Sequence, residues 1–204
     1  DAEIAVAREL GMRAVITDHH ECHDTLPEAD AVVDCKRSDC RYPFDSLAGV
    51  GVAFKLICAL EGDADAALDR YADLVALGTV ADVMPIVGEN RVIVAEGLKK
   101  MAETSNVGLE MLLREAGMKH KRLTSSTISF VLAPRINAAG RMGHAELAAE
   151  LFLTHDPVRA QTLAARLCEQ NKLRQNEENQ ILEQALVRLR KEYNPLEDKI
   201  IVLA

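Results

Sequence analysis

The order of apolar and polar positions predicts strands and helices in the first third of the chain, and helices alone thereafter. One helical pattern runs up to Leu10 and another covers residues 47–61. Between them, two short runs rich in β-branched residues, 14–17 and 31–34, predict buried strands. This alternation is typical of a parallel sheet covered by helices, so we expect an α/β fold with a partial parallel sheet.

The remaining chain carries apolar residues at helical spacing, interrupted by prolines. Pro85 prevents the first of these helices from continuing. We expect helices over residues 63–80, 91–102, 108–116, and from about residue 124 toward Pro134.

A much longer helix is predicted over residues 156–194. Asp156 followed by Pro157 is a typical helix start, and Asn194 followed by Pro195 is a typical stop. At roughly 1.5 Å per residue, this helix would span about 55 Å. Its two ends are amphipathic, whereas its centre is polar almost all round. A coiled coil needs a continuous apolar stripe, so we expect a helix that bridges two domains.

Both ends of the chain have the pattern of interior sequence. The first helix has no start signal, and residues 199–204 form an apolar strand pattern without a partner. We therefore expect an internal piece of a longer protein, whose last residues begin a second domain.

The composition predicts an aliphatic core. Hydrophobic residues make up 49% of the 204 positions, aromatic residues only 3%, and Trp is absent. The net charge of −8 argues against a protein that coats nucleic acid, although it is compatible with a local basic groove. The chain shows no signal peptide and no apolar span of about 18 residues, so we expect a cytoplasmic protein.

The five cysteines are an odd number without C-x-x-C spacing, which favours reduced thiols. A zinc site built from Cys22, His23, Cys35 and Cys40 is conceivable, but the irregular spacing argues against it.

The clearest candidate chemistry is Asp18-His19-His20, directly after the first predicted strand. In open α/β sheets, functional residues gather at the carboxyl ends of the strands. A carboxylate and two imidazoles packed together need a cation or a dense hydrogen-bond network. If the strand continues through them, the two histidines point to different sides and have different roles. The alternative is a pair of strand-end histidines satisfied by backbone groups.

Asp82 is a second candidate, because it continues the apolar stripe of the helix over residues 63–80 with no basic residue nearby. Such a carboxylate requires a partner from elsewhere, and a metal ion is a strong candidate. The alternative is an Asp that caps the next turn or faces solvent at a helix end.

Two further segments could contact phosphate. Gly49 and Gly51 open a predicted helix, where backbone N–H groups can approach an anion, although tight packing explains them equally well. Residues 134–144 combine small residues with arginines between helices, which suits phosphate oxygens or a solvated loop. The basic stretch 119–122 is expected to be a solvated loop, or to contact a nucleic-acid backbone weakly and without sequence preference. The three remaining histidines, His23, His120 and His155, are expected at the surface.

Five segments in order resemble the DHH phosphoesterase superfamily, and within it the exonucleases that digest single-stranded DNA from the 5′ end. Because they cover nearly the whole chain, the resemblance is specific. They are residues 15–20 with Asp18-His19-His20, residues 39–54, residues 76–85 with Asp82, residues 134–141, and the polar helix centre, residues 171–178.

The resemblance implies a nuclease that uses manganese or magnesium in a two-metal site. At the matching positions, His19 and Asp82 correspond to metal ligands. His20 corresponds to a contact with the substrate phosphate or leaving group, and Asp18 to a supporting acid. The segment that resembles the phosphate-facing loop contains Arg135, Asn137, Arg141 and His144.

The resemblance also implies a domain order. Residues 1–105 correspond to the C-terminal part of a DHH catalytic domain, 106–155 to its helical part, 156–194 to the connecting helix, and 195–204 to the first strand of a second, DHHA1-like domain. The remaining metal ligands, including an Asp-x-Asp pair, would precede Asp1. We therefore expect the 204-residue piece alone to be inactive and to bind metal poorly.

The implied partners are single-stranded DNA, a single-strand-binding protein and a RecQ-type helicase, in DNA repair and recombination, without a membrane. Two alternatives stay open. One is a DHH enzyme that cleaves short oligonucleotides, 3′-phosphoadenosine phosphate or cyclic dinucleotides. The other is a non-catalytic relative that only binds single strands.

Overall fold

The small sheet lies at the N-terminal end of a largely helical molecule. A computed structural model describes residues 2–23, 25–141, 145–193 and 200–201. Helix α1 (Ala2–Glu9) precedes strands β1 (Val15–Asp18) and β2 (Ala31–Asp34). The two strands pair in parallel, and the register places Asp18 opposite Asp34. The expected α/β class is confirmed, and both strands end in a carboxylate at the same edge.

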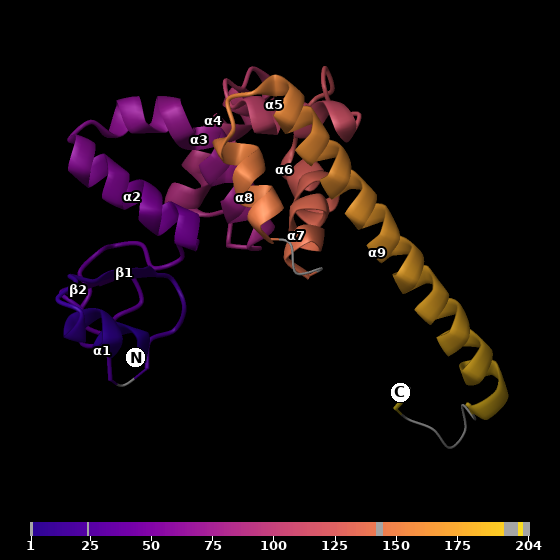
Figure 1. Cartoon of the computed structure of the whole chain (residues 1–204), viewed down its shortest axis with the longest axis horizontal. Helices are drawn as coiled ribbons and strands as arrows, with labels where there is room; N and C mark the ends of the chain where they lie inside the picture. The colour runs from indigo at the N-terminus through magenta and orange to yellow at the C-terminus, as the bar shows by residue number, and fades with distance from the viewer. Residues whose placement is uncertain (1, 24, 142–144, 194–199, 202–204) are drawn as a thin grey trace.

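Helix α2 (Gly49–Glu61) begins above the carboxyl end of β1, as Figure 1 shows. Its start has no side-chain cap, and Gly62 ends it in the left-handed conformation. The helix therefore brings its first turn close to the residues that follow β1.

Helices α3 (Ala64–Ala81) and α4 (Gly88–Ala102) form the most extensive helix pair of the described chain. A Cβ atom on Gly97 would lie 2.2 Å from the carbonyl oxygen of Ala72 and 2.3 Å from Cβ of Ala76. Only glycine allows the two backbones to approach this closely. This contact holds the second half of α3, which leads to Asp82, against α4.

The remaining elements build the main core around α9. The core contains the fully buried side chains of Leu109, Leu112, Leu132, Leu151, Leu163 and Leu167. The helices predicted over residues 108–116, from about residue 124 and over 156–194 begin within about two residues of the expected positions. The elements are α5 (Val107–Glu115), α6 (Ser125–Thr127), a π-helical turn (Ile128–Leu132), α7 (Ala133–Arg141), α8 (Ala145–Leu153) and α9 (Pro157–Glu192).

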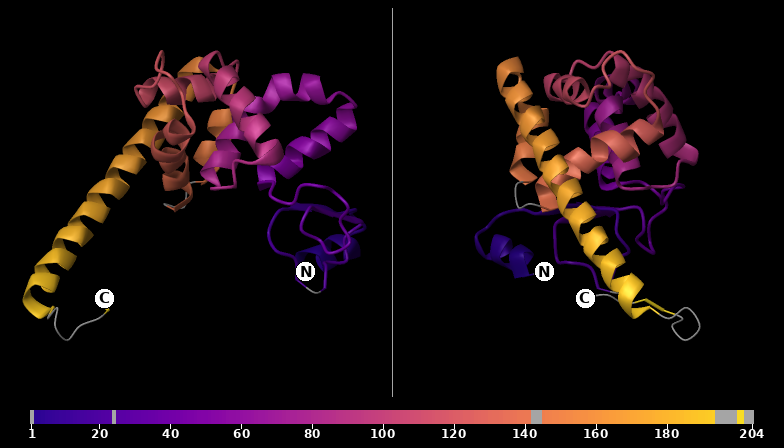
Figure 2. Two further views of the ribbon diagram at one scale, coloured as in Figure 1. Left: turned by 180° about the vertical axis from the view of Figure 1, so that it is seen from behind. Right: turned by 90° about the vertical axis from the view of Figure 1, so that its right-hand side faces the viewer.

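Helix α9 has 36 residues and begins as expected, because the Asp156 side chain accepts a hydrogen bond from the backbone N–H of Val158. Its first turns pack on α5, α7 and α8. Its later turns extend away from the rest of the molecule, as Figure 2 shows. The apolar side chains of Ile181, Leu182 and Leu186 there are exposed.

One expectation about the backbone needs correction. Residues 133–141 form helix α7 rather than a connecting loop, and this helix continues without a break from α6 and the π-helical turn. Pro134 follows directly on the π-helical turn, where the α-helical hydrogen-bond pattern that its missing N–H would break is already interrupted. Of the predicted terminal strand, residues 199–204, only residues 200 and 201 are described, and the strand therefore stays a prediction. No described helix combines the length and the apolar character needed to cross a bilayer.

Candidate functional site

Asp18 organises the turn that follows β1. Its Oδ1 atom accepts hydrogen bonds from the backbone N–H groups of His19 at 2.7 Å and His20 at 3.2 Å, and lies 2.7 Å from Nδ1 of His20. The side-chain hydrogen bond from His20, followed by the backbone bond from His19, holds the pKa of the Asp18 carboxyl below its usual range. An ionised Asp18 requires the proton on Nδ1, which leaves Nε2 of His20 for a ligand or substrate.

His19 contacts both His20 and the start of α2. Its side chain is 18% exposed, whereas that of His20 is 75% exposed. The two rings lie side by side, with centroids 4.3 Å apart. They do not point to different sides as predicted, because the strand ends at Asp18.

Gly49 provides the other wall of the His19 site. A Cβ atom at this position would lie 3.1 Å from Cδ2 of His19. A Cβ on Gly51 would meet Leu47 at 3.3 Å. Both contacts favour the packing explanation of the two glycines over a phosphate-binding one.

Asp82 reaches the same place from the end of α3. Its Oδ2 atom lies 3.5 Å from Nε2 of His19. Asp82 is the C-cap of α3 rather than a member of its apolar stripe, which corrects that interpretation. Val83 follows with a φ of 58°, and the N–H of Met84 donates to the carbonyl of Thr79 at 3.2 Å. This is a Schellman-type end with valine in place of the usual glycine.

The position of Asp82 is electrostatically unfavourable without a cation. The carboxyl end of a helix carries partial negative charge, which destabilises a nearby carboxylate. Within the described part of the chain, the ion pair recorded for Asp82 is the one with His19. A metal ion bound by Asp82 and His19 would offset the repulsion between the Asp82 carboxylate and the end of α3.

The donor set fits a divalent ion. One ligand atom each from Asp18, His19 and His20 lie within 4.8 Å of one another. Neighbouring ligands of an octahedral ion bound at about 2.1 Å are about 3 Å apart, close to the separation of His19 and Asp82. Carboxylate oxygens and imidazole nitrogens together suit manganese and similar divalent ions.

The predicted phosphate-contact residues divide into two groups. Asn137 is exposed on α7 and lines a cavity of about 280 Å³, together with Ala81 and Val83 on either side of Asp82. Arg135 instead folds back on its own helix, where Nη1 donates to the carbonyl of Val131 at 2.5 Å. The side chain of Arg141 and all of His144 lie outside the described residues.

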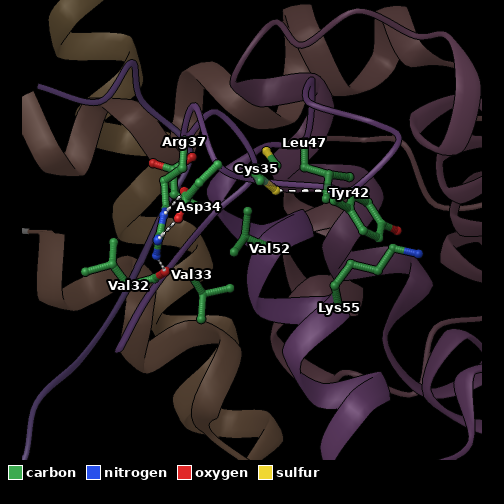
Figure 3. Close-up of a pocket in the computed structure, with 11 residues that line it drawn as sticks. Val32, Val33, Asp34, Cys35, Arg37, Tyr42, Leu47, Val52 and Lys55 are labelled. Carbon is green, nitrogen blue, oxygen red and sulfur yellow. Dashed lines mark hydrogen bonds and ion pairs between the residues drawn. The ribbon is translucent and has the colours of Figure 1, made fainter. Parts of the chain in front are cut away.

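A second cavity of about 340 Å³ separates β2 from α2 and contains no metal-type cluster among the described residues (Figure 3). Val33 and Val52 face it, with Arg37 at one end and Tyr42 at the other. Cys35 and Cys40 line this cavity, whereas Cys22 and His23 line another cavity beside His20. All five cysteines are free, and the conceivable zinc ligands are not brought together.

Sequence reasoning missed three residues at the edges of the site. Asp34 ends β2 beside Asp18, and the run Ala31–Asp34 carries the same strand-then-acid signal that identified Asp18. Asn90 is fully buried on α4 and donates to the carbonyls of Ser46 and Pro85. Arg174 of α9 lines the cavity beside Asp82. Neither Asn90 nor Arg174 has a local sequence signal, because each reaches the site only through contacts with segments that are distant in sequence.

The comparisons with known sequences agree across the chain. Residues 1–79 match the DHH family, N-terminal domain. The chain is 41% identical over 202 residues to the single-stranded-DNA-specific exonuclease RecJ of Bacillus subtilis (strain 168), covering 99% of this chain and 25% of that protein. It is 37% identical over 198 residues to RecJ of Escherichia coli (strain K12), covering 91% of this chain and 34% of that protein. The chain thus spans about a quarter to a third of the length of these relatives.

Crystal structures show the same fold. Exonuclease RecJ bound to manganese matches with a TM-score of 0.80 and 38% identity, over 92% of this chain and 47% of that chain. RecJ of Thermus thermophilus in complex with Mn²⁺ matches with a TM-score of 0.76 and 36% identity, over 94% and 28%. The Mg²⁺ complex of the Thermus protein matches with a TM-score of 0.71 and 38% identity, over 86% of this chain and 26% of that chain. These structural neighbours hold a divalent metal.

Proposed function

Because the chain belongs to the DHH family, we propose that it forms part of the metal centre of an exonuclease that digests single-stranded DNA from the 5′ end. The observation that carries the proposal is the convergence of His19 and Asp82. These residues are 63 positions apart in sequence, yet their side chains lie 3.5 Å apart. The proposal is supported by the relatives named single-stranded-DNA-specific exonuclease RecJ. It is also supported by the RecJ crystal structures that hold Mn²⁺ or Mg²⁺.

Each residue of the site has a distinct part in the proposal. His19 and Asp82 hold a manganese or magnesium ion. When bound, a divalent ion activates water and stabilises the charged oxygens of a phosphodiester. Asp18 fixes the orientation of His20, whose Nε2 contacts a phosphate or leaving-group oxygen. Asn137 contacts the substrate phosphate from α7, and Arg135, Arg141 and His144 remain predictions for that contact.

Manganese binding to the 204-residue chain tests the metal site directly. Titration calorimetry or manganese electron paramagnetic resonance is expected to show weak binding that both His19→Ala and Asp82→Ala reduce at least tenfold, because each removes a ligand. His120→Ala, which changes an exposed histidine elsewhere, serves as the control and is expected to bind as the unchanged chain does. Equal affinity in all four proteins would reject the site.

The reaction is tested by placing this chain in the Bacillus relative, where it replaces the matching segment of 202 residues. The chimera is expected to release nucleotides from single-stranded DNA in manganese, and His19→Ala in the chimera is expected to abolish release. Faster cleavage of dinucleotides than of long single strands would favour the DHH oligonucleotide phosphodiesterase instead. A folded, DNA-binding chimera without cleavage would favour the non-catalytic alternative.

The remaining expectations are part of the same proposal. We propose that residues 1–105 and 106–155 belong to the catalytic domain and that residues 156–194 connect it to a second domain begun by residues 195–204. A single-strand-binding protein and a RecQ-type helicase are proposed as partners. A role in DNA repair and recombination predicts a cytoplasmic location.

A further inference from the structure

The cavity beside Asp82 contains an arginine that the metal site does not use. Ala81 and Val83 form one wall, Ser129 and Asn137 another, and Arg174 of α9 closes it. Its volume is about 280 Å³. Of the described residues that line the cavity, Arg174 is the charged one, and the others are small, apolar or neutral polar. The positively charged side chain of Arg174 thus lines the cavity, and none of the described lining residues is a carboxylate.

Two neighbours on α9 hold the guanidinium in place. Asn171 is 2% exposed, and its Oδ1 atom accepts from Nε of Arg174 at 3.4 Å and from Nη2 at 3.2 Å. Glu178, one turn later and half-exposed, pairs with Nη1. The Arg174 side chain itself is 23% exposed. A fixed guanidinium needs little ordering when an anion binds, so it binds the anion more tightly than a mobile one would.

We propose that Arg174 forms a phosphate subsite, in which a substrate phosphate next to the metal centre binds between Arg174 and Asn137. The guanidinium donates to two phosphate oxygens, which are geometrically matched to it. Asn171 acts as a positioning residue that orients the guanidinium. Glu178 competes with the phosphate for Nη1 in the empty site. The inference rests on the proposed function, since the substrate supplies the phosphate.

Binding of a 5′-phosphorylated oligothymidylate to the 204-residue chain, followed by fluorescence anisotropy over a range of salt concentrations, tests the subsite. Arg174→Ala is expected to weaken binding about tenfold and to lower the slope of log affinity against log salt by about 0.7, the effect of one phosphate contact on a single strand. Arg174→Lys, which keeps the charge and the aliphatic stem, is expected to retain the slope and lose part of the affinity. Glu178→Gln is expected to strengthen binding.

Arg159→Ala is the matched control. Arg159 is also on α9 and also pairs with a glutamate, Glu150, but it does not line the cavity. The control is expected to match the unchanged chain in affinity and slope. If Arg174→Ala, judged folded by circular dichroism, behaves as Arg159→Ala does, the subsite is wrong.

A second probe separates this inference from the proposed function. Inorganic phosphate is titrated while the Nε–H resonance of Arg174, assigned by its absence in Arg174→Lys, is followed by nuclear magnetic resonance, and a saturable shift that the Nε–H resonance of Arg159 does not show supports the subsite. If phosphate shifts this resonance but the chimera does not cleave DNA, the subsite stands and the proposed reaction fails. If neither phosphate nor the oligonucleotide affects Arg174 while the chimera cleaves DNA, the reaction stands and the subsite is overturned.

Discussion

At the scale of single residues, the position of the His19 ring is limited by its contacts with His20 and Gly49. The His20 ring lies against it at a tilt of 41°, and the absence of a side chain at Gly49 leaves room beside Cδ2. The ring is therefore held with Nε2 toward Asp82 at 3.5 Å. A small displacement of this ring changes the distance between two proposed ligands of one ion.

Gly49→Ala tests this constraint. The new Cβ would lie 3.1 Å from Cδ2 of His19, so the ring has to move by a few tenths of an ångström. We expect manganese affinity to fall several-fold. Thermal or chemical denaturation should show little change in stability, because Gly49 is the first residue of α2, where alanine is tolerated and the preference over glycine is smaller than in a helix interior.

The matched control for this change is Gly51→Ala in the same turn of α2. Its Cβ would approach Leu47 rather than His19. We expect it to leave manganese affinity unchanged. A similar loss of affinity in both variants would mean that the start of α2, rather than the position of the His19 ring, determines metal binding.

The residues of the site differ in how far the sequence predicts them. Asp18, His19 and His20 were found because polar ligand-type residues directly after an apolar strand are a local pattern. Asp82 was found from helical spacing, but its place as a C-cap was not, because a valine with positive φ gives no glycine signal. Arg174 could not be found, because only the packing of α9 brings it to α3.

At the scale of elements, α4 connects the two loops that carry the site. The buried amide of Asn90 donates to the carbonyl of Ser46, before α2, at 2.6 Å and to that of Pro85, after Asp82, at 3.0 Å. The loop that leads to Gly49 and the loop that follows Asp82 are thus tied to one side chain. This tie holds the two halves of the candidate metal site together.

Asn90→Ala is expected to lower the free energy of unfolding by about 1–3 kcal/mol, because it removes both hydrogen bonds that this fully buried side chain donates. Urea denaturation measures the loss. Arg91→Ala, at the exposed neighbouring position, is expected to change stability by less than about 0.5 kcal/mol. If the two variants are equally stable, the loops are held by other contacts.

Helix α5 carries an ion-pair network that makes stability depend on pH. Glu110 accepts from Lys119 and from Arg114, each at 2.8 Å, and these bonds, that of Lys119 first, hold the pKa of Glu110 below its usual range. A lowered folded-state pKa stabilises the protein above the unfolded-state pKa of about 4.3. This contribution is lost as the pH falls from there through the lower folded-state pKa.

Glu110→Gln is therefore expected to lower stability at neutral pH and to flatten its decline below about pH 4.3. Denaturation at a series of pH values checks both effects. Glu115→Gln, an exposed carboxylate on the same helix, is the control and is expected to keep the slope of the unchanged chain. Identical profiles for the two variants would show that the Glu110 pairs add no stability.

The elements themselves were largely predictable, and the exceptions have a physical cause. Helices α2, α3, α5 and α9 follow from apolar spacing and from local start and stop signals. Helix α7 was predicted as a connector because its glycine, proline and arginines resemble loop composition. Tertiary packing overrides that preference, since Ala138 and Ala139 are fully buried. The preceding π-helical turn has no sequence signature that periodicity detects.

At the scale of the whole molecule, the main core and the candidate site share α3. The core side of this helix packs on α4 and the π-helical turn, while its end carries Asp82. The early turns of α9 complete that core, and Arg174 lies where the helix leaves it. Stability and the position of the phosphate-facing residues thus depend on the same helix contacts.

The two halves of α9 should contribute very differently to the free energy of unfolding. Leu167 is fully buried in the main core, whereas Leu182 is 56% exposed on the part that extends away. Leu167→Ala is expected to lower the free energy of unfolding by about 2–5 kcal/mol, because it leaves a cavity. Leu182→Ala is expected to change it by less than about 0.5 kcal/mol.

Denaturation of the two variants, together with hydrogen exchange along α9, measures this difference. Amides near Leu167 should exchange only through global unfolding, while those near Leu182 should exchange through local fraying. The late turns need tertiary contacts to stay helical, because helices outside a packed core are marginal in water. Slow exchange near Leu182 at low protein concentration, or a large loss in Leu182→Ala, would contradict the described arrangement, since a surface must then cover the late apolar stripe.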